Sequence, residues 1–258
     1  MNEPVPPMPV VFAGHGSPMN ALGGPAADAW RALGAGMPRP KAVLCISAHW
    51  YVEETAVTAM AAPRTIHDFS GFPKPLYDIA YPAPGAPWLA ERVAELAGAT
   101  PVRRDHDWGL DHGAWTVLTH MFPAADVPVA QLALDRRRDG GFHYGLGRAL
   151  APLREEGVLI LGSGDVVHNL RTMGPDMEPY DWARRFNAQV KAQALACDHA
   201  GLAAFETLGA DARLSIPTPE HFLPLLYVLG AQTEDDPVIM FNDVIQLGSI
   251  SMTGFRIG

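Results

Sequence analysis

The segment VLILGSGDVVH at residues 158–168 is an apolar run that passes through two glycines to a histidine. Two other segments have the same design, VVFAGH at 10–15 and VLCISAH at 43–49. Continuous apolar runs of this length are typical of strands that are buried on both faces of a sheet. We therefore expect the three histidines to lie at one rim of a sheet, where α/β proteins bind their ligands. Because neutral imidazole is the commonest protein ligand for divalent transition metals, a metal enzyme is the first hypothesis.

Apolar segments alternate along the chain with segments of helical character. The expected strands are 9–13, 41–48, 128–134 and 157–162, and the expected helices are 24–35, 87–98, 113–122 and 141–153. This alternation predicts an α/β fold with a central, mostly parallel sheet flanked by helices on both faces. Segments 56–60 and 248–255 alternate apolar and polar residues, which is typical of half-solvated antiparallel edge strands, so the sheet is expected to be mixed. The 258 residues allow one large domain or two small ones.

Two further segments have a distinct character. Residues 65–87 hold five prolines together with Phe69, Phe72, Tyr77 and Tyr81, too many prolines for a regular element but enough aromatic rings to pack. We interpret this segment as a long ordered loop over the site, although a simple surface excursion has the same composition. Residues 180–198 show apolar or small residues at helical spacing, which predicts an amphipathic surface helix.

The composition limits the classes of function. The 258 residues carry a net charge of −9 with only 19 Lys and Arg, so nucleic acid is not an expected partner. The chain has two cysteines, Cys45 and Cys197, and we expect no disulfide. The segment Met1–Pro9 lacks the basic and apolar pattern of a secretory signal, and no apolar stretch is long enough to span a membrane. A cytoplasmic enzyme without a membrane partner is the expectation.

Each histidine at a strand end is also compatible with an ordinary structural role. The glycines around His15 also suit a phosphate-binding turn, but the Lys that such a loop needs is absent. His49 alone reads as a buried histidine bonded to a carbonyl, yet two histidines from neighbouring strand ends can reach one ion. For His168 we expect a turn that starts a short helix, with Asp165 or Ser163 as its cap.

Two more motifs place histidines near expected helix starts. In PTPEHFLPL at 217–225, Thr218 reads as a cap and Pro219 as the first helical residue. Either Glu220 or His221 in this motif can complete a metal set. His112 follows Asp111, which reads as a helix cap. The remaining histidines are expected to be structural or solvated: His67, His106, His120, His143 and His199.

Seven motifs in this order closely resemble the class III, LigB-like extradiol ring-cleaving dioxygenases, in particular the 4,5-DOPA-extradiol-dioxygenase-like group. The resemblance covers nearly the whole chain, and each motif alone is weak. They are GHGSP (14–18), SAHW (47–50), HDFSGFP (67–73), LDHGAW (110–115), GSG with HNL (162–164, 168–170), PEHFLP (219–224) and SISMTGF (249–255).

The resemblance implies a single-domain α/β fold and a non-haem Fe(II) that inserts both atoms of O₂ into a catechol. His15 and His49 match the two histidine ligands. In the wider family the third ligand is a glutamate, whereas this group implies His221 in place of Glu220. Zn(II) can occupy the same site in proteins of this group, and imidazoles suit both metals.

The resemblance also implies roles for two other histidines. His168 matches the acid/base, which takes a phenolic proton and returns it later, and it is able to become a fourth ligand of zinc. His112 would protonate an intermediate during ring rearrangement. Aromatic side chains such as Trp50, Phe69 and Trp115 are candidates for the wall of a substrate slot, although each is also suited to a core.

Three rival functions remain open on the sequence. A zinc-dependent hydrolase or lyase could use the same histidines, since such a site also activates water. A metal-binding protein without turnover is the second rival, and a plain binding module is the third. The substrate beyond a DOPA-like catechol, the cleavage position and the oligomeric state do not follow from the sequence.

Overall fold

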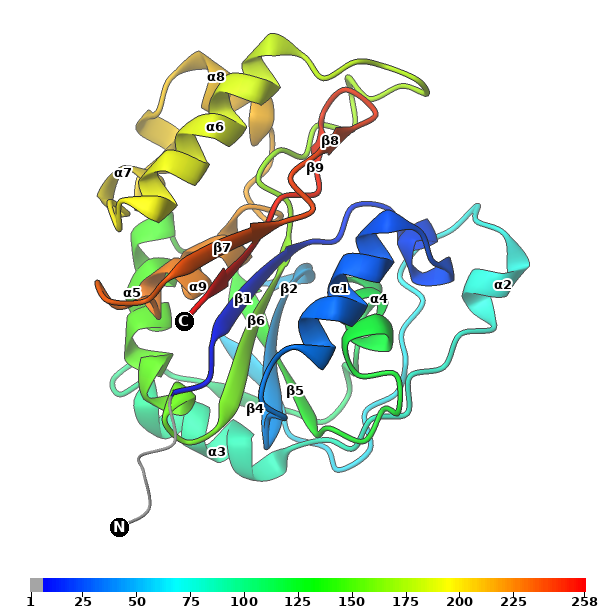
Figure 1. The fold of residues 1–258 in the computed structure, drawn as a ribbon. Helices are drawn as coiled ribbons and strands as arrows, with labels where there is room; N and C mark the ends of the chain where they lie inside the picture. Colours follow the sequence, from blue (N-terminus) through cyan, green and yellow to red (C-terminus); the bar gives the residue numbers. More distant parts are fainter. Residues whose placement is uncertain (1–6) are drawn as a thin grey trace.

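The computed structural model describes residues 7–258 and shows a central eight-stranded sheet with helices on both sides (Figure 1). The prediction about the segment Met1–Pro9 falls mostly on residues 1–6, which lie outside the described part. Within residues 7–258, no helix is both long enough and apolar enough to cross a membrane.

The sheet is mixed, with the long apolar strands at its centre. Its strand order is β4-β3-β5-β2-β6-β1-β10-β7, and the central neighbours β5, β2, β6 and β1 pair in parallel. A separate two-stranded sheet joins β8 to β9. The strands are β1 (Val10–Gly14), β2 (Ala42–Val52), β3 (Ala56–Thr58), β4 (Arg103–Asp105), β5 (Val129–Asp135), β6 (Val158–Gly164), β7 (Val238–Phe241), β8 (Ile245–Gln246), β9 (Ile250–Ser251) and β10 (Gly254–Ile257).

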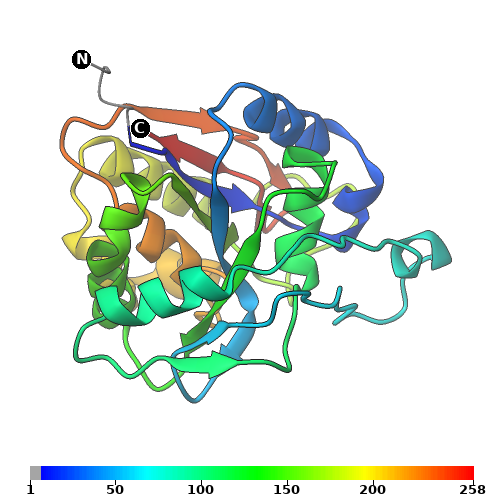
Figure 2. The ribbon, with the colours of Figure 1, turned by 90° about the horizontal axis from the view of Figure 1, so that it is seen from below.

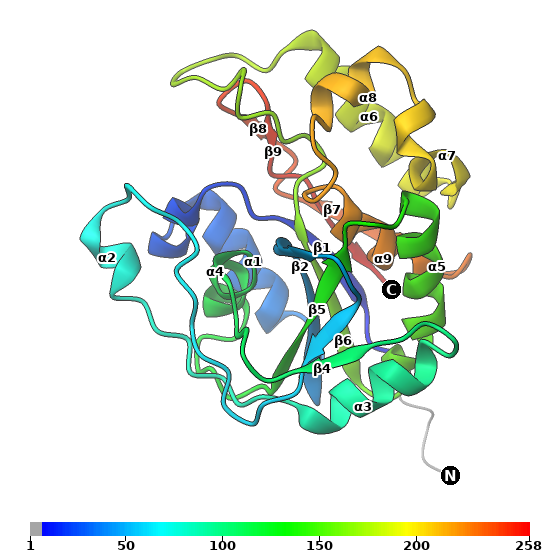
Figure 3. The ribbon, with the colours of Figure 1, turned by 180° about the vertical axis from the view of Figure 1, so that it is seen from behind.

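Helices cover both faces of this sheet, as expected. Helices α1 and α4 lie on one face, while α3, α5 and α9 lie on the other (Figures 1 and 3). Helices α6 and α8 pack against each other. The helices are α1 (Pro25–Ala35), α2 (Lys74–Tyr77), α3 (Pro87–Leu96), α4 (His112–Met121), α5 (Gly140–Leu150), α6 (Asp181–Leu195), α7 (Ala200–Ala203), α8 (Ala210–Ser215) and α9 (Leu223–Gly230), with 3₁₀ turns η1 (Pro18–Leu22), η2 (Ala151–Arg154) and η3 (Phe205–Thr207).

The apolar side chains of the central strands are buried because each strand contributes side chains to a hydrophobic core on both faces of the sheet. Successive side chains of a strand point to opposite faces. Leu44 and Ile46 of β2 belong to the core under α3, α5 and α9, whereas Val43 and Cys45 belong to the core under α1 and α4. All four side chains are fully buried, which explains why the strand shows no polar alternation.

The two expected edge strands do not lie at edges. Segment 248–255 does lead into an antiparallel strand, but β10 is inserted between β1 and β7. Strand β3 pairs antiparallel with β5, yet β4 covers its outer side and its residues are buried. Both predictions of an edge were wrong because the short strands β4 and β7, whose sequences carry no clear strand pattern, form the actual edges.

Two other segments agree with the expectation. The amphipathic helix expected at 180–198 is α6. Residues 65–87 form a long loop with one short helix, α2, which projects from the body of the molecule (Figure 2). This segment is called the aromatic loop below.

Candidate metal centre

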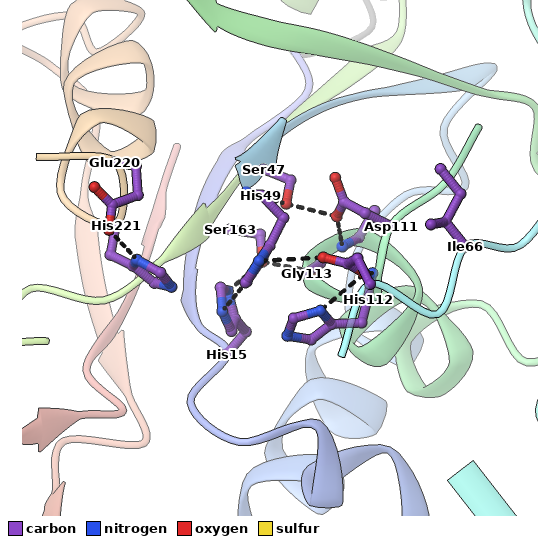
Figure 4. A network of polar contacts seen from close by, with 12 residues as sticks. His15, Ser47, His49, Ile66, Asp111, His112, Gly113, Ser163, Glu220 and His221 are labelled. Carbon is purple, nitrogen blue, oxygen red and sulfur yellow. Dashed lines mark hydrogen bonds and ion pairs between the residues drawn. The ribbon is translucent and has the colours of Figure 1, made fainter. Parts of the chain in front are cut away.

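Five histidines from five separate segments converge at the carboxyl ends of the central strands, and Figure 4 shows His15, His49, His112 and His221. The five are His15, His49, His112, His168 and His221, the same five that the sequence singled out. Their rings lie in mutual contact, with centroid separations between 3.5 and 5.7 Å. The local structure around each ring determines which nitrogen faces the shared space.

His15 follows β1 and is held by the neighbouring strand β6. Its Nδ1 lies 3.0 Å from Ser163 Oγ, and that hydroxyl donates its own hydrogen to the carbonyl oxygen of Gly113 at 2.6 Å. Because the Ser163 hydrogen is already used, Nδ1 of His15 must carry the proton and donate to Ser163. The Nε2 lone pair of His15 is therefore free.

His49 lies in β2 where the pairing with β5 shifts register, between Ile46 and Tyr51. Its Nδ1 lies 3.2 Å from Asp68 Oδ2. A carboxylate at this distance favours a proton on Nδ1, which leaves Nε2 with its lone pair. That Nε2 lies 3.1 Å from Nε2 of His15.

His221 is oriented by the residue before it. Its Nδ1 donates to Glu220 Oε1 at 3.2 Å, so Nε2 is again the free nitrogen. The expected helix start at Pro219 was wrong, because α9 begins at Leu223 and the preceding residues form a turn in which Phe222 N–H donates to the Pro219 carbonyl. The Thr218 hydroxyl donates to Glu220 instead of capping a helix.

Glycine permits the close approach of this turn to β6. The His221 carbonyl accepts the Asp165 N–H at 2.9 Å, and a Cβ on Gly164 would lie 2.1 Å from that carbonyl oxygen. A side chain at Gly164 would therefore push the turn, and the His221 ring with it, away from His15.

The ring centroids of His15, His49 and His221 have the spacing expected around one divalent transition metal. They are 5.1, 5.3 and 5.2 Å apart, nearly an equilateral triangle. Imidazoles that bind one ion at about 2.1 Å with tetrahedral angles have ring centres about 5 Å apart. Two free lone pairs 3.1 Å apart repel each other, and a cation beside both would relieve this repulsion. Ligand atoms that lie within 4.8 Å of one another group His15 and His49 with His112, and His15 and His221 with Asp165.

The protonation states also suit a metal. Burial, followed by the neighbouring histidines, lowers the pKa of His15 and His221 well below the ordinary value. Burial lowers the pKa of His49 to about 3, with His112 adding to the effect and Asp68 opposing it. All three imidazoles are therefore neutral at neutral pH, the form that binds metal.

His112 is the first residue of α4, and Asp111 caps this helix as expected. Asp111 Oδ1 accepts from the Ala114 N–H and from the Ser47 hydroxyl. The His112 ring lies against that of His49, with centroids 3.8 Å apart. A Cβ at Gly113 would lie 2.4 Å from Ser47 Oγ and 2.9 Å from the His49 ring, so only glycine lets α4 approach β2 this closely.

His168 lies beside His221, with the two rings stacked at 3.5 Å. The short helix expected before it does not form. Asp165 accepts the Gly16 N–H instead of capping a helix, and the His168 N–H donates to the carbonyl of Ser215. Burial lowers the pKa of His168 to about 4. A ring nitrogen of His168 lies within 4.8 Å of ligand atoms of Glu220 and His221, a spacing that could hold a metal ion. No group of this kind joins His168 to His15 or His49.

Two carboxylates near the histidines were not predicted from the sequence to belong to the site. Asp68 lies between two histidines, with Oδ2 3.2 Å from His49 Nδ1 and Oδ1 3.0 Å from His112 Nδ1, and it accepts the His112 N–H at 2.9 Å. Burial acts to raise the pKa of Asp68, but the contacts with His112 and His49 outweigh it and lower the pKa. The one available signal was its place in the HDFSGFP motif.

Asp165 is fully buried beneath His15. Its Oδ2 lies 3.9 Å from His15 Nε2 and has no hydrogen-bond partner within residues 7–258. Burial raises the pKa of this carboxyl well above its usual range. The carboxylate layer behind the histidines therefore consists of Asp68, Asp165 and Glu220.

A cavity of about 390 Å³ opens in front of the five histidines. Phe69 and Phe72 of the aromatic loop form part of its wall, so this loop does lie over the site. Trp50 and Trp115 are buried and do not line the cavity. A larger hollow of about 630 Å³ lies between β3, β4 and the segment after β5, and no histidine borders it.

Comparison with known proteins gives consistent matches over almost the full length. A family model described as the catalytic LigB subunit of aromatic ring-opening dioxygenase matches residues 8–253, the part that contains every histidine of the site. A protein of Escherichia coli (strain K12) named 4,5-DOPA dioxygenase extradiol is 48% identical over 259 residues, which cover 97% of this chain and 95% of that protein.

Two further matches extend the comparison to a plant protein and to a solved structure. A protein of Beta vulgaris with the same name is 37% identical over 254 residues, covering 95% of this chain and 94% of the relative. The crystal structure of an uncharacterized protein from Escherichia coli K12 matches with a TM-score of 0.85 at 42% identity, covering 97% of this chain and 100% of the other.

Proposed function

The chain belongs to the LigB family of aromatic ring-opening dioxygenases, and on this premise we propose that His15, His49 and His221 hold the Fe(II) of an extradiol dioxygenase. Such an enzyme inserts both atoms of O₂ into a catechol and cuts the ring beside the hydroxyl pair. Two observations together support the ligand assignment: the three ring centroids lie 5.1, 5.3 and 5.2 Å apart, and each ring has an acceptor within 3.2 Å of Nδ1, so that three Nε2 lone pairs are left for one ion.

The contact between Glu220 and His221 favours His221 as the third ligand. Glu220 accepts the Nδ1 hydrogen of His221, and in this role it orients the ring and fixes its tautomer. His221 is thus the proposed third ligand, and Glu220 its supporting partner. Iron, when bound, supplies the redox chemistry for O₂ and lowers the pKa of the catechol hydroxyls. Imidazoles also suit Zn(II), which we expect as an alternative occupant.

His168 and His112 are the proposed proton-transfer residues. The lowered pKa of His168 keeps its ring neutral at neutral pH, with a lone pair able to accept a phenolic proton inside the cavity. His112 has its Nδ1 beside Asp68, which leaves Nε2 as the nitrogen able to hold or release a proton toward the ring that is being opened. Phe69 and Phe72 border the space in which the catechol ring would lie.

The names of the relatives indicate the first substrate. Relatives from Escherichia coli and Beta vulgaris are named for 4,5-DOPA cleavage, so we propose that L-DOPA is cleaved by this chain as well. We further propose that residues 1–258 form one domain that carries the activity, and that the enzyme works in the cytoplasm, where the two free thiols Cys45 and Cys197 stay reduced.

The function is tested by anaerobic reconstitution with Fe(II), followed by L-DOPA and simple catechols in air. The expected result is O₂ uptake matched by a yellow ring-opened product. Hydrolysis or another reaction without O₂, in zinc-loaded protein, would instead support the hydrolase or lyase. Tight metal binding that leaves every catechol intact would support a metal-binding protein without turnover.

A further inference from the structure

The walls of the cavity are apolar beyond the five histidines. Six large apolar side chains line it: Phe69, Phe72, Leu170, Met173, Leu247 and Ile250. The other polar side chains on its wall are those of Ser17 and Gln246, and no Lys, Arg, Asp or Glu of residues 7–258 lines it. A substituent on the catechol ring would therefore lie among apolar groups.

Two acidic side chains lie directly behind the histidines. Asp68 contacts His49 and His112, and Glu220 accepts from His221. A carboxylate on the substrate would lose water in the cavity and find no cation among the lining side chains. Burying an anion without a partner is costly, and like charges nearby add to the cost.

From this environment we propose that the preferred substrates are neutral catechols with an apolar substituent, and that a carboxylate on the substituent lowers kcat/KM. The inference rests on the proposed ring-cleaving function and names the substrate class within it. L-DOPA carries a carboxylate and an ammonium group together, so it is cleaved, but less efficiently than a neutral catechol of similar size. The catechol hydroxyls remain the polar end that every substrate presents to the histidines.

The mouth of the cavity identifies where the substituent lies. Leu170 and Met173 are 56% and 46% exposed and also line the cavity, so they border its opening. A lysine in place of Met173 has a similar length and can keep its ammonium group at the solvent edge. Met177 lies four residues further along the chain, is 38% exposed and does not line the cavity.

The test compares pairs of related substrates in which one member carries a carboxylate and the other is neutral. We expect 3-(3,4-dihydroxyphenyl)propanoate to have a kcat/KM at least about tenfold below that of its methyl ester, a difference equal to about 1.4 kcal/mol. L-DOPA is likewise expected to fall below its neutral analogue 4-ethylcatechol. Equal or better turnover of the acid would overturn the inference, whereas failure to turn over any catechol would refute the proposed function instead.

Binding to the zinc-loaded protein provides a readout without turnover. Calorimetry should give the ester the lower Kd, and an acid that binds as tightly as the ester would contradict the inference even if the enzyme shows no activity. The Met173→Lys variant should improve the acid several-fold and leave the ester unchanged, as expected for one new ion pair at a partly exposed site. Met177→Lys adds the same charge outside the cavity and should leave the ratio of kcat/KM for the acid to kcat/KM for the ester as in wild type. An equal change of this ratio in both variants would overturn the inference.

Discussion

Replacing Asp68 by asparagine tests how the site holds its metal ligand. Asp68 presents one oxygen to His49 Nδ1 at 3.2 Å and the other to His112 Nδ1 at 3.0 Å. An asparagine of the same shape keeps one acceptor and places an NH₂ group at the other position, so one imidazole loses its acceptor. The charge that holds both rings is lost as well.

The size of the effect follows from these contacts. A carboxylate beside Nδ1 of a metal-bound imidazole fixes the tautomer and orients the ring, and 1.4 kcal/mol is about tenfold in affinity. Asp68 is 17% exposed, so the interaction is only partly screened. We therefore expect Asp68→Asn to weaken metal binding by about 10–100-fold, the range found when a partner of a metal-bound histidine is removed.

Competition with a chelator measures the metal affinity, and thermal unfolding of the metal-free protein shows whether the variant still folds. Asp105→Asn is the matched control. Asp105 also accepts two backbone N–H groups and an arginine, but it lies at the end of β4 and has no contact with the histidines. Wild-type metal affinity in a folded Asp68→Asn variant, or an equal loss in Asp105→Asn, would refute the reasoning.

Four more results follow from the site and the core. His168→Ala should keep most of the metal and lose most turnover, as measured by metal analysis and O₂ uptake; full loss of metal would make His168 chiefly a ligand. His49→Ala should lose both metal and activity, and activity retained there would remove the proposed metal site. Glu220→Gln should bind metal far better than His221→Ala in the same chelator titration, and the reverse order would make Glu220 the ligand. Burial lowers the pKa of His143 to about 4, so the folded state binds fewer protons than the unfolded state between about pH 4 and 6.5. The free energy of unfolding therefore falls by up to about 3 kcal/mol as the pH drops from 6.5 to 4. Denaturant unfolding of the metal-free protein should show a smaller loss over this range for His143→Gln, and identical slopes would exclude His143 as the cause.

The central strands and the five histidines were predictable because their signals are local. Each long apolar run is buried on both faces, so its sequence alone marks it as a strand, and the residue that follows must lie at the rim. Strand β4 could not be found in this way, since its three residues are Arg103, Arg104 and Asp105. Strand β7 carries apolar residues that are partly exposed on an edge, without the alternation that marks a half-buried strand.

The remaining features depend on contacts between distant segments. The segment at Pro219 resembles a helix start in sequence, but α9 begins only at Leu223. The chain stays in a turn because the His221 carbonyl accepts the Asp165 N–H, and because Gly164 has no side chain that would clash with this carbonyl. Asp68 contacts residues from β2 and α4, neither of which is near it in the sequence. No local pattern indicates such a partner.

The most direct test of the central claim is the fate of molecular oxygen. The Fe(II)-loaded enzyme is supplied with a catechol under ¹⁸O₂, and the ring-opened product is analysed by mass spectrometry in parallel with a His49→Ala control. The account predicts that both labelled atoms appear in one product molecule, and that the control forms no product. A product without label, or with label in amounts that do not depend on His49, would contradict extradiol cleavage at this histidine site.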